Sequence, residues 1–142
     1  MPLKNYTTEV PAMKSIGQIE NNLVKHGAIS IVVNYGPDRE PENLCFVIST
    51  PQGTIPFRLP ANIKAVASLL QGQRVHGYTK PELASRVAWR IIKDWVDAQL
   101  AIIETEMVTI EQVFLPYMLV KGQNTLYETM KDYGFYLTEG QG

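Results

Sequence analysis

The chain has 142 residues, and its 13 basic and 14 acidic side chains leave a formal net charge of -1. Hydrophobic residues make up 45% of the sequence and charged residues 19%. These values are typical of one globular domain with a single core, and they exclude a disordered charged tail. The balanced charge also excludes a histone-like protein, which needs a large excess of Lys and Arg. We therefore expect a single domain over residues 1–142.

The N-terminal region predicts an extended arm followed by a helix. Residues 1–14 show no clear period, so we expect them to form the arm. Ser15 and Gln18 have the spacing of a capping box, in which the hydroxyl accepts an amide proton and the amide side chain reaches back. Gly27 is suited to end this helix, because glycine adopts the left-handed conformation at little cost.

Three strands are predicted after this helix. Apolar side chains recur at every second position in the runs 29–35, 44–49 and 55–59, which is the period of a half-buried strand. Residues 50–53 predict a tight turn between the second and third runs. Pro56 lacks an amide proton, so we expect the third strand to lie at an edge of the sheet or to carry a bulge.

The remainder of the chain predicts helices. Apolar residues at helical spacing indicate a helix over 63–70 and a long helix at about 80–105, opened by a capping box at residues 79–82. Thr109 and Gln112 form a further capping box for a short helix, and Asn124 is expected to cap a last helix that ends at Gly134. Residues 138–142 are expected to form a frayed tail. The predicted class is α+β, with an N-terminal helix, a three-stranded antiparallel sheet and C-terminal helices.

The sequence offers little for catalysis. No phosphate-binding glycine loop, dinucleotide-binding turn or nucleophile elbow is present. The two histidines, His26 and His76, fall in different linkers, and the single cysteine, Cys45, predicts an inert packed thiol. We therefore expect no catalytic residues, no metal site and no cofactor. No apolar run approaches the roughly 20 residues of a membrane span, so we expect a cytoplasmic protein that does not bind a membrane.

A basic face on the long helix is the clearest candidate for a binding site. Arg86, Arg90 and Lys93 share the face opposite the apolar stripe, and Arg58 is expected to join them. This cluster predicts a site for nucleic acid, an anion or a partner protein, although a solvated charged face has the same pattern. Trp89 lies on the flank of the stripe, where the ring either packs in the core or stacks on a base.

The apolar face of the same helix is a candidate interface with a second copy of the chain. Trp95, Gln99 and Ile102 lie on this face, and a buried amide such as that of Gln99 needs a hydrogen-bonding partner. That partner is either backbone or the same residue of another protomer. We expect a homo-oligomer, with a dimer as the simplest form and these three residues at its seam.

Three stretches resemble a known group of proteins. They are GTIPFRLPAN at 53–62, RVAWRIIKDWV at 86–96 and VFLPYM at 113–118. Together they are similar to small hypothetical proteins encoded by tailed phages and bacterial prophages, over about Tyr6 to Glu128. The resemblance implies an accessory protein of the bacterial cytoplasm during infection or lysogeny. It carries no motif with an assigned activity, and hence no site residue.

These observations leave two hypotheses of different kinds. The first is a non-catalytic accessory protein that engages nucleic acid, or a replication or recombination partner, through the basic helix face. The second is an anti-defence protein that inhibits a bacterial immune complex, such as a CRISPR-type nuclease, or sequesters a nucleotide signal. An enzyme is disfavoured because the catalytic motifs are absent from the sequence.

Overall fold

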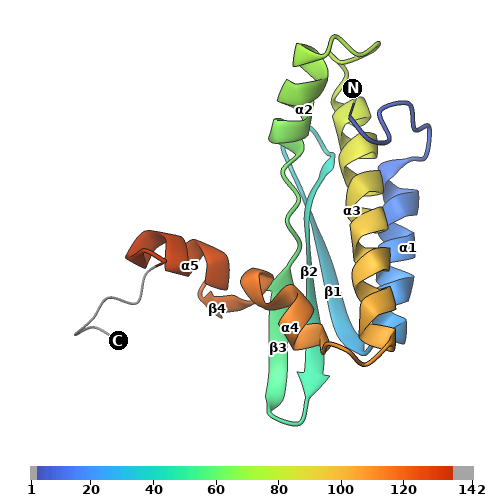
Figure 1. The fold of residues 1–142 in the computed structure, drawn as a ribbon. Coiled ribbons are helices and arrows are strands. Elements are labelled where there is room, and N and C mark those ends of the chain that lie inside the picture. Colours follow the sequence, from blue (N-terminus) through green and yellow to red (C-terminus); the bar gives the residue numbers. More distant parts are fainter. Residues whose placement is uncertain (1–2, 136–142) are drawn as a thin grey trace.

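A three-stranded sheet and five α-helices make up the fold (Figure 1). The structure, a computed structural model, describes residues 3–135. The tail expected to fray, residues 138–142, lies outside this range. In chain order the elements are α1 (Ala12–Lys25), β1 (Ala28–Tyr35), β2 (Pro41–Thr50), β3 (Gly53–Arg58), α2 (Ile63–Gly72), α3 (Pro81–Glu104), α4 (Ile110–Phe114), the 3-10 turn η1 (Leu115–Tyr117), β4 (Leu119–Lys121), β5 (Asn124–Thr125) and α5 (Leu126–Tyr133). This order confirms the predicted α+β class.

The sheet is antiparallel in the order β1-β2-β3, so β2 is central. Phe46 on β2 pairs with Ile31 on β1 and with Phe57 on β3. Because side chains alternate along a strand, these three residues lie on one face of the sheet, which is the inner face. The strand β3 lies at an edge, as Pro56 predicts, since a proline removes one hydrogen-bond donor from a ladder.

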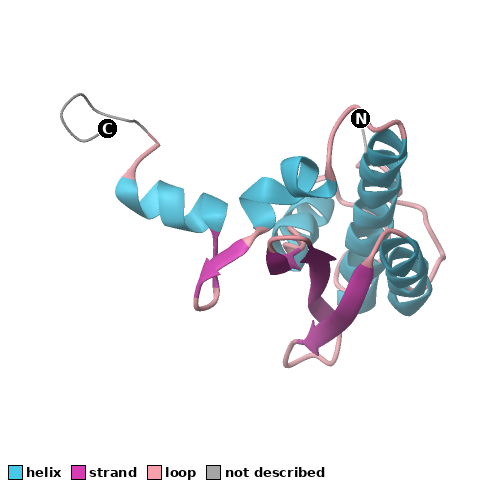
Figure 2. Cartoon of the chain, turned by 90° about the horizontal axis from the view of Figure 1, so that it is seen from below, coloured by secondary structure: helices cyan, strands magenta, loops and turns pink. Residues whose placement is uncertain are grey.

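The helices α1 and α3 cover most of the inner face of the sheet, and Phe114 of α4 packs on Phe46 and Phe57 beside them. Figure 2 shows α1 and α3 on one side of the strands, and no described helix on the other. The core between the layers contains fully buried side chains such as Ile16 and Leu23 from α1 and Val96 from α3. Phe46 and Phe57 stack there with ring centroids 5.1 Å apart. The opposite, outer face of the sheet is not covered by any described element.

A smaller apolar cluster holds α2 against the first turns of α3. Leu70 is fully buried there against Leu83 and Val87, and Leu3 of the N-terminal arm packs on the cluster. The helix α3 therefore contributes to both clusters. Its 24 residues give a length of about 36 Å, which explains how one element joins the two ends of the molecule.

Two predicted helix starts are wrong by a short distance. The helix α1 begins at Ala12, not at Ser15, and the Ser15 side chain is fully buried one turn inside the helix. Burial of Ala12 in the core favours this extra turn, so the arm is shorter than expected. The helix α3 begins at Pro81, so its N-cap is Lys80 rather than Thr79. The fixed φ of proline suits the first helical position, which moves the cap by one residue.

The C-terminal segment differs most from expectation. Residues 119–125 form the hairpin β4–β5, which the sequence analysis does not predict, and Asn124 lies in a strand. Thr125 caps α5 instead, in a capping box with Glu128. Both views show the hairpin and α5 projecting from the β3 side of the molecule (Figures 1 and 2). The predicted capping box of Thr109 and Gln112 is confirmed.

Candidate functional site

The predicted basic face of α3 packs against the N-terminal part of the chain. The Nη1 atom of Arg90 donates to the side-chain oxygen of Gln18 on α1 at 2.8 Å, and Nε of Arg86 donates to the carbonyl of Thr8 at 3.4 Å. Lys93 forms an ion pair with Asp97 at 2.6 Å. All three basic side chains are half-buried. Each of the three side chains therefore makes one polar contact within the protein and is only partly open to solvent.

Arg58 lies apart from the other three basic residues. Its side chain is on the outer face of the sheet, where Nη2 contacts Oε1 of Glu128 at 2.5 Å and Nη1 donates to the carbonyl of Gln123 at 2.7 Å. Because α3 packs on the inner face, the structure does not bring Arg58 together with the basic residues of α3. Its contacts instead fasten the C-terminal segment to β3.

Trp89 is a core residue. Its side chain is fully buried, and the indole N–H donates to the carbonyl of Pro41 at 3.1 Å. A buried indole needs such an acceptor, and the first residue of β2 supplies it. Of the two alternatives for Trp89, packing in the core is the one observed, and in this conformation the ring offers no surface on which a base could stack.

The three residues expected at an oligomer seam are not equivalent in the fold. The ring of Trp95 packs edge-on against Phe114 at 5.6 Å and Tyr117 at 5.5 Å. The chain thus covers this residue with its own α4 and η1. Gln99 is half-buried, whereas Ile102 is 37% exposed. The arrangement on α3 gives no continuous apolar seam through all three side chains.

Asp94 on α3 anchors the N-terminal arm. Nδ2 of Asn5 donates to its carboxylate at 3.0 Å, and Nζ of Lys4 lies 3.3 Å from the same oxygen. Burial raises the pKa of Asp94, but the bonds from Asn5 and Lys4 and the charges of Lys4 and Arg90 together lower it further. The resulting pKa lies below the usual 3.8, so the carboxylate is charged at neutral pH and holds the arm.

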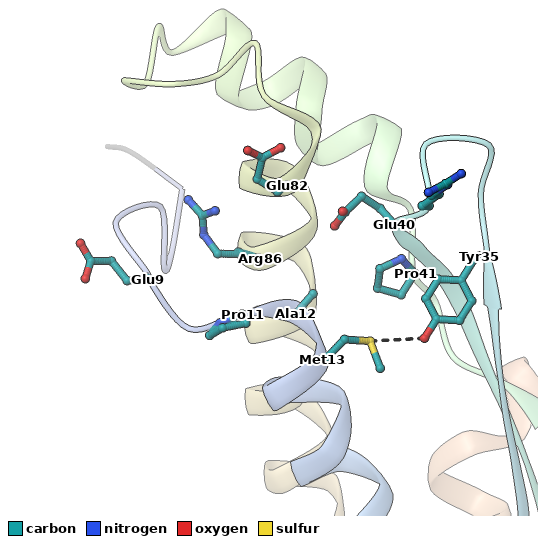
Figure 3. Close-up of a pocket in the computed structure, with 10 residues that line it drawn as sticks. Glu9, Pro11, Ala12, Met13, Tyr35, Glu40, Pro41, Glu82 and Arg86 are labelled. Atoms are coloured by element: carbon teal, nitrogen blue, oxygen red, sulfur yellow. Dashed lines mark hydrogen bonds between the residues drawn. The ribbon is translucent and has the colours of Figure 1, made fainter.

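A shallow cleft lies between the arm, the β1–β2 hairpin and the first turns of α3 (Figure 3). Its volume is about 380 Å³. The lining includes two guanidinium groups, those of Arg39 and Arg86, and three carboxylates, those of Glu9, Glu40 and Glu82. Figure 3 shows the Glu9 carboxylate turned away from α3. This mixed charge gives the cleft no strong preference for an anion or for a cation, so we assign no ligand to it.

The described residues show no metal-binding cluster, and the single cysteine is half-buried. Across residues 3–135, no three His, Cys, Asp or Glu side chains converge in a group that could hold a metal ion. Burial raises the pKa of Cys45, although the charge of Arg58 partly opposes this shift. A raised pKa leaves less thiolate at neutral pH, in agreement with the predicted inert thiol.

Three exposed basic residues that are not among the predicted site residues lie on α2 and the loop before α3. Lys64 lies on the first turn of α2, and Arg74 and Lys80 lie in the loop. All three are exposed, and none has an ion-pair partner among the described residues. We call these three residues the basic corner. A signal was available in the sequence, because residues 43–81 contain no Asp or Glu at all.

Comparisons with known proteins leave the chain without an assigned family. No protein-family model, no curated protein and no solved structure matches it. None of the helices in residues 3–135 is long and apolar enough to cross a membrane.

Proposed function

We propose that the protein is a non-catalytic accessory protein that binds nucleic acid through the basic corner. The observation that carries this proposal is the set of three exposed cations, Lys64, Arg74 and Lys80, on a stretch without acidic residues. Phosphate groups are the ligands expected for such a surface, because unpaired cations release condensed counterions when they neutralise phosphates. The exposed side chains of His76 and Tyr78 lie in the same loop and add polar and aromatic contacts.

The basic corner is a better candidate than the basic face of α3. The cations of α3 already contact Gln18, Thr8 and Asp97, and they are half-buried, so they present less charge to a phosphate than the exposed residues of the basic corner do. The resemblance to phage proteins places this activity, as part of the same proposal, in the cytoplasm of an infected or lysogenic bacterium.

Binding to labelled single-stranded and double-stranded DNA tests the proposal, with fluorescence anisotropy measured over a series of salt concentrations. We expect affinity to fall as salt rises, with a log–log slope of roughly -3 on duplex DNA if three phosphates are contacted. The triple variant K64E/R74E/K80E should lose binding. Lys14→Glu, an exposed lysine on α1, is the control with the same change per site and should bind as the wild type does.

Two outcomes would contradict the proposal. Absence of binding to either DNA at low salt would remove nucleic acid as the ligand. Loss of binding in R86E/R90E, with K64E/R74E/K80E unaffected, would return the site to the basic face of α3. Circular dichroism of each variant shows whether the fold is retained, which matters most for R86E/R90E because both residues make internal contacts.

A further inference from the structure

The helix α5 packs on its own chain along one side only, where Leu126 and Thr129 are half-buried and the helix contacts η1 and the β4–β5 hairpin. None of its eight residues is fully buried. Three large side chains are exposed: Tyr127 by 50%, Met130 by 42% and Tyr133 by 80%. Positions 127, 130 and 133 are spaced by three residues, so these side chains follow one side of the helix. The ring of Phe135 lies 5.7 Å from that of Tyr127 and extends the same apolar surface. An isolated helix of this length is marginal in water, so its apolar side calls for a partner surface.

The outer face of the sheet is a second uncovered surface on the same chain. Val32 on β1 is 52% exposed, and Cys45, Val47 and Pro56 are half-buried beside it. Cys45 pairs with Val32 on one side and with Arg58 on the other, so the cysteine lies in the middle of this face. The charge of Arg58 is already paired with Glu128. The face therefore carries a central apolar strip of Val32, Cys45, Val47 and Pro56, flanked by exposed polar side chains such as Ser30, Ser49 and Thr54.

The attachment of α5 places it close to this face without covering it. Arg58 projects from the outer face and contacts Glu128 on the first turn of α5. The hairpin is held at the edge of β3 by a bridge between Met118 and Phe57. From these contacts the helix runs away from the sheet (Figures 1 and 2). A second copy placed beside the edge of β3 would bring its own outer face under this helix.

We propose that two copies of the chain form a dimer by exchanging their C-terminal segments, with α5 of each copy seated on the outer face of its partner's sheet. Such an arrangement is two-fold symmetric and closed, as most homodimers are. The dimensions agree, because eight helical residues span about 12 Å and three strands span about 10 Å between the axes of the outer two.

The area required for a stable dimer favours reciprocal exchange. Covering Tyr127, Met130 and Tyr133 buries on the order of 300 Å² of these side chains. Stable interfaces bury about 800 Å² on each partner, so one seated helix is too small. In the reciprocal form each copy contributes both a helix and a sheet face, which doubles the area to about 600 Å² per copy and leaves about 200 Å² to be supplied by neighbouring residues. Val120 and Leu115, exposed by 42% and 43% beside α5, bring further apolar surface.

The mass of the full-length protein in solution is the first test. Size-exclusion chromatography with light scattering, at 1 to 100 µM, should give a dimer for the wild type. Met130→Glu on α5 and Val47→Glu on the outer face should each give a monomer with an unchanged circular dichroism spectrum. Val24→Glu should remain a dimer, because Val24 is 59% exposed on α1 and lies outside both surfaces. A monomeric wild type at 100 µM overturns the proposal.

Crosslinking through Cys45 gives a test that does not depend on weakening the interface. In the variant Met130→Cys the new thiol should lie against Cys45 of the other copy, so a short bis-maleimide should yield a covalent dimer. Met13→Cys is the control, since Met13 is 50% exposed on α1 and should give little dimer. A crosslink within one chain in Met130→Cys would show that α5 folds onto its own sheet. Equal dimer yields from both variants would show random collision, and either result overturns the exchange.

Discussion

Individual polar groups in this protein join elements that are distant in sequence. The indole N–H of Trp89 donates a hydrogen bond to the carbonyl of Pro41, 48 residues away in sequence. The carboxylate of Asp94 accepts one from Asn5, 89 residues away. Each bond pairs a group that would otherwise lose its contact with water on burial, a loss of about 1–3 kcal/mol for a fully buried group. A helical projection places both residues on α3, but it contains no information about the strand or the arm that approaches them.

Asp94 gives the arm a dependence on pH. An aspartate with a pKa lower in the folded than in the unfolded state binds fewer protons when folded. Its stabilisation is therefore present above the unfolded pKa and is lost as the pH falls through the folded value, which lies below 3.8. We expect NMR signals of the arm, residues 3–11, to shift toward random-coil values below that pH.

The variant Asp94→Asn separates this effect from general acid unfolding. Asparagine keeps a side-chain oxygen that accepts from Asn5, but it has no charge to attract Lys4. The attachment of the arm to α3 should therefore be weaker at neutral pH. The attachment that remains should not change with pH through position 94. If arm signals of the wild type and of D94N change identically between pH 7 and pH 3, another group controls the arm.

At the scale of elements, the local capping signals explain most helix ends, and long-range packing explains the exceptions. Thr109 and Thr125 form complete capping boxes with Gln112 and Glu128. Ser15 has the same kind of spacing, yet its side chain is fully buried inside α1. An N-cap hydrogen bond stabilises a helix by about 1 kcal/mol, whereas the extra turn of α1 buries the methyl group of Ala12, worth about 0.8 kcal/mol, and adds backbone hydrogen bonds to the carbonyl of Pro11. The burial of Ala12 and the added backbone bonds together outweigh the capping signal at this position.

The cap of α5 matters more than usual because this helix is short and peripheral. Thr125→Ala removes the acceptor for the amide of Glu128 and should destabilise the helix by about 1 kcal/mol. Amide exchange within residues 126–133 should become about five times faster, while the exchange of core amides in β2 should stay unchanged. Thr109→Ala is the matched control for α4 and should leave α5 unaffected. Unchanged exchange in T125A would mean that contacts other than the cap hold α5.

At the scale of the whole molecule, α3 couples two apolar clusters. The larger cluster lies between the sheet, α1 and α3, and the smaller one lies between α2 and the start of α3. Both tryptophans, Trp89 and Trp95, belong to the larger cluster. Because one continuous helix passes through both clusters, we expect the domain to unfold in a single cooperative transition.

Leu70→Ala tests this coupling from the far end. Leu70 is fully buried in the smaller cluster, so truncation should cost about 2–5 kcal/mol of unfolding free energy. If α3 transmits the loss, urea transitions followed by far-ultraviolet circular dichroism and by tryptophan fluorescence should both move to lower urea and should coincide. Loss of helical signal ahead of the fluorescence change would show that α2 unfolds separately. Ala65→Gly, at an exposed position of the same helix, should shift the midpoint much less.

The fold class and the type of most elements can be predicted from local sequence patterns. The switch from a period of 3.6 to a period of 2 and back depends on neighbouring residues, so it is visible without the tertiary structure. The long helix predicted at about 80–105 is observed at 81–104, and the strand with Pro56 lies at an edge. The hairpin β4–β5 was not predicted, because two strands of three and two residues are too short to show a period.

Local sequence patterns do not predict which charged and aromatic side chains are exposed. Their exposure depends on how distant segments pack in the folded protein. Arg86 and Arg90 lie on the polar face of an amphipathic helix, yet α1 and the arm approach this face and accept their hydrogen bonds. Trp89 is enclosed for the same reason, by the start of β2. Lys64 and Arg74 stay exposed because no element within residues 3–135 folds over α2 on that side. Exposure depends on segments up to 78 residues away, and a local pattern cannot contain that information.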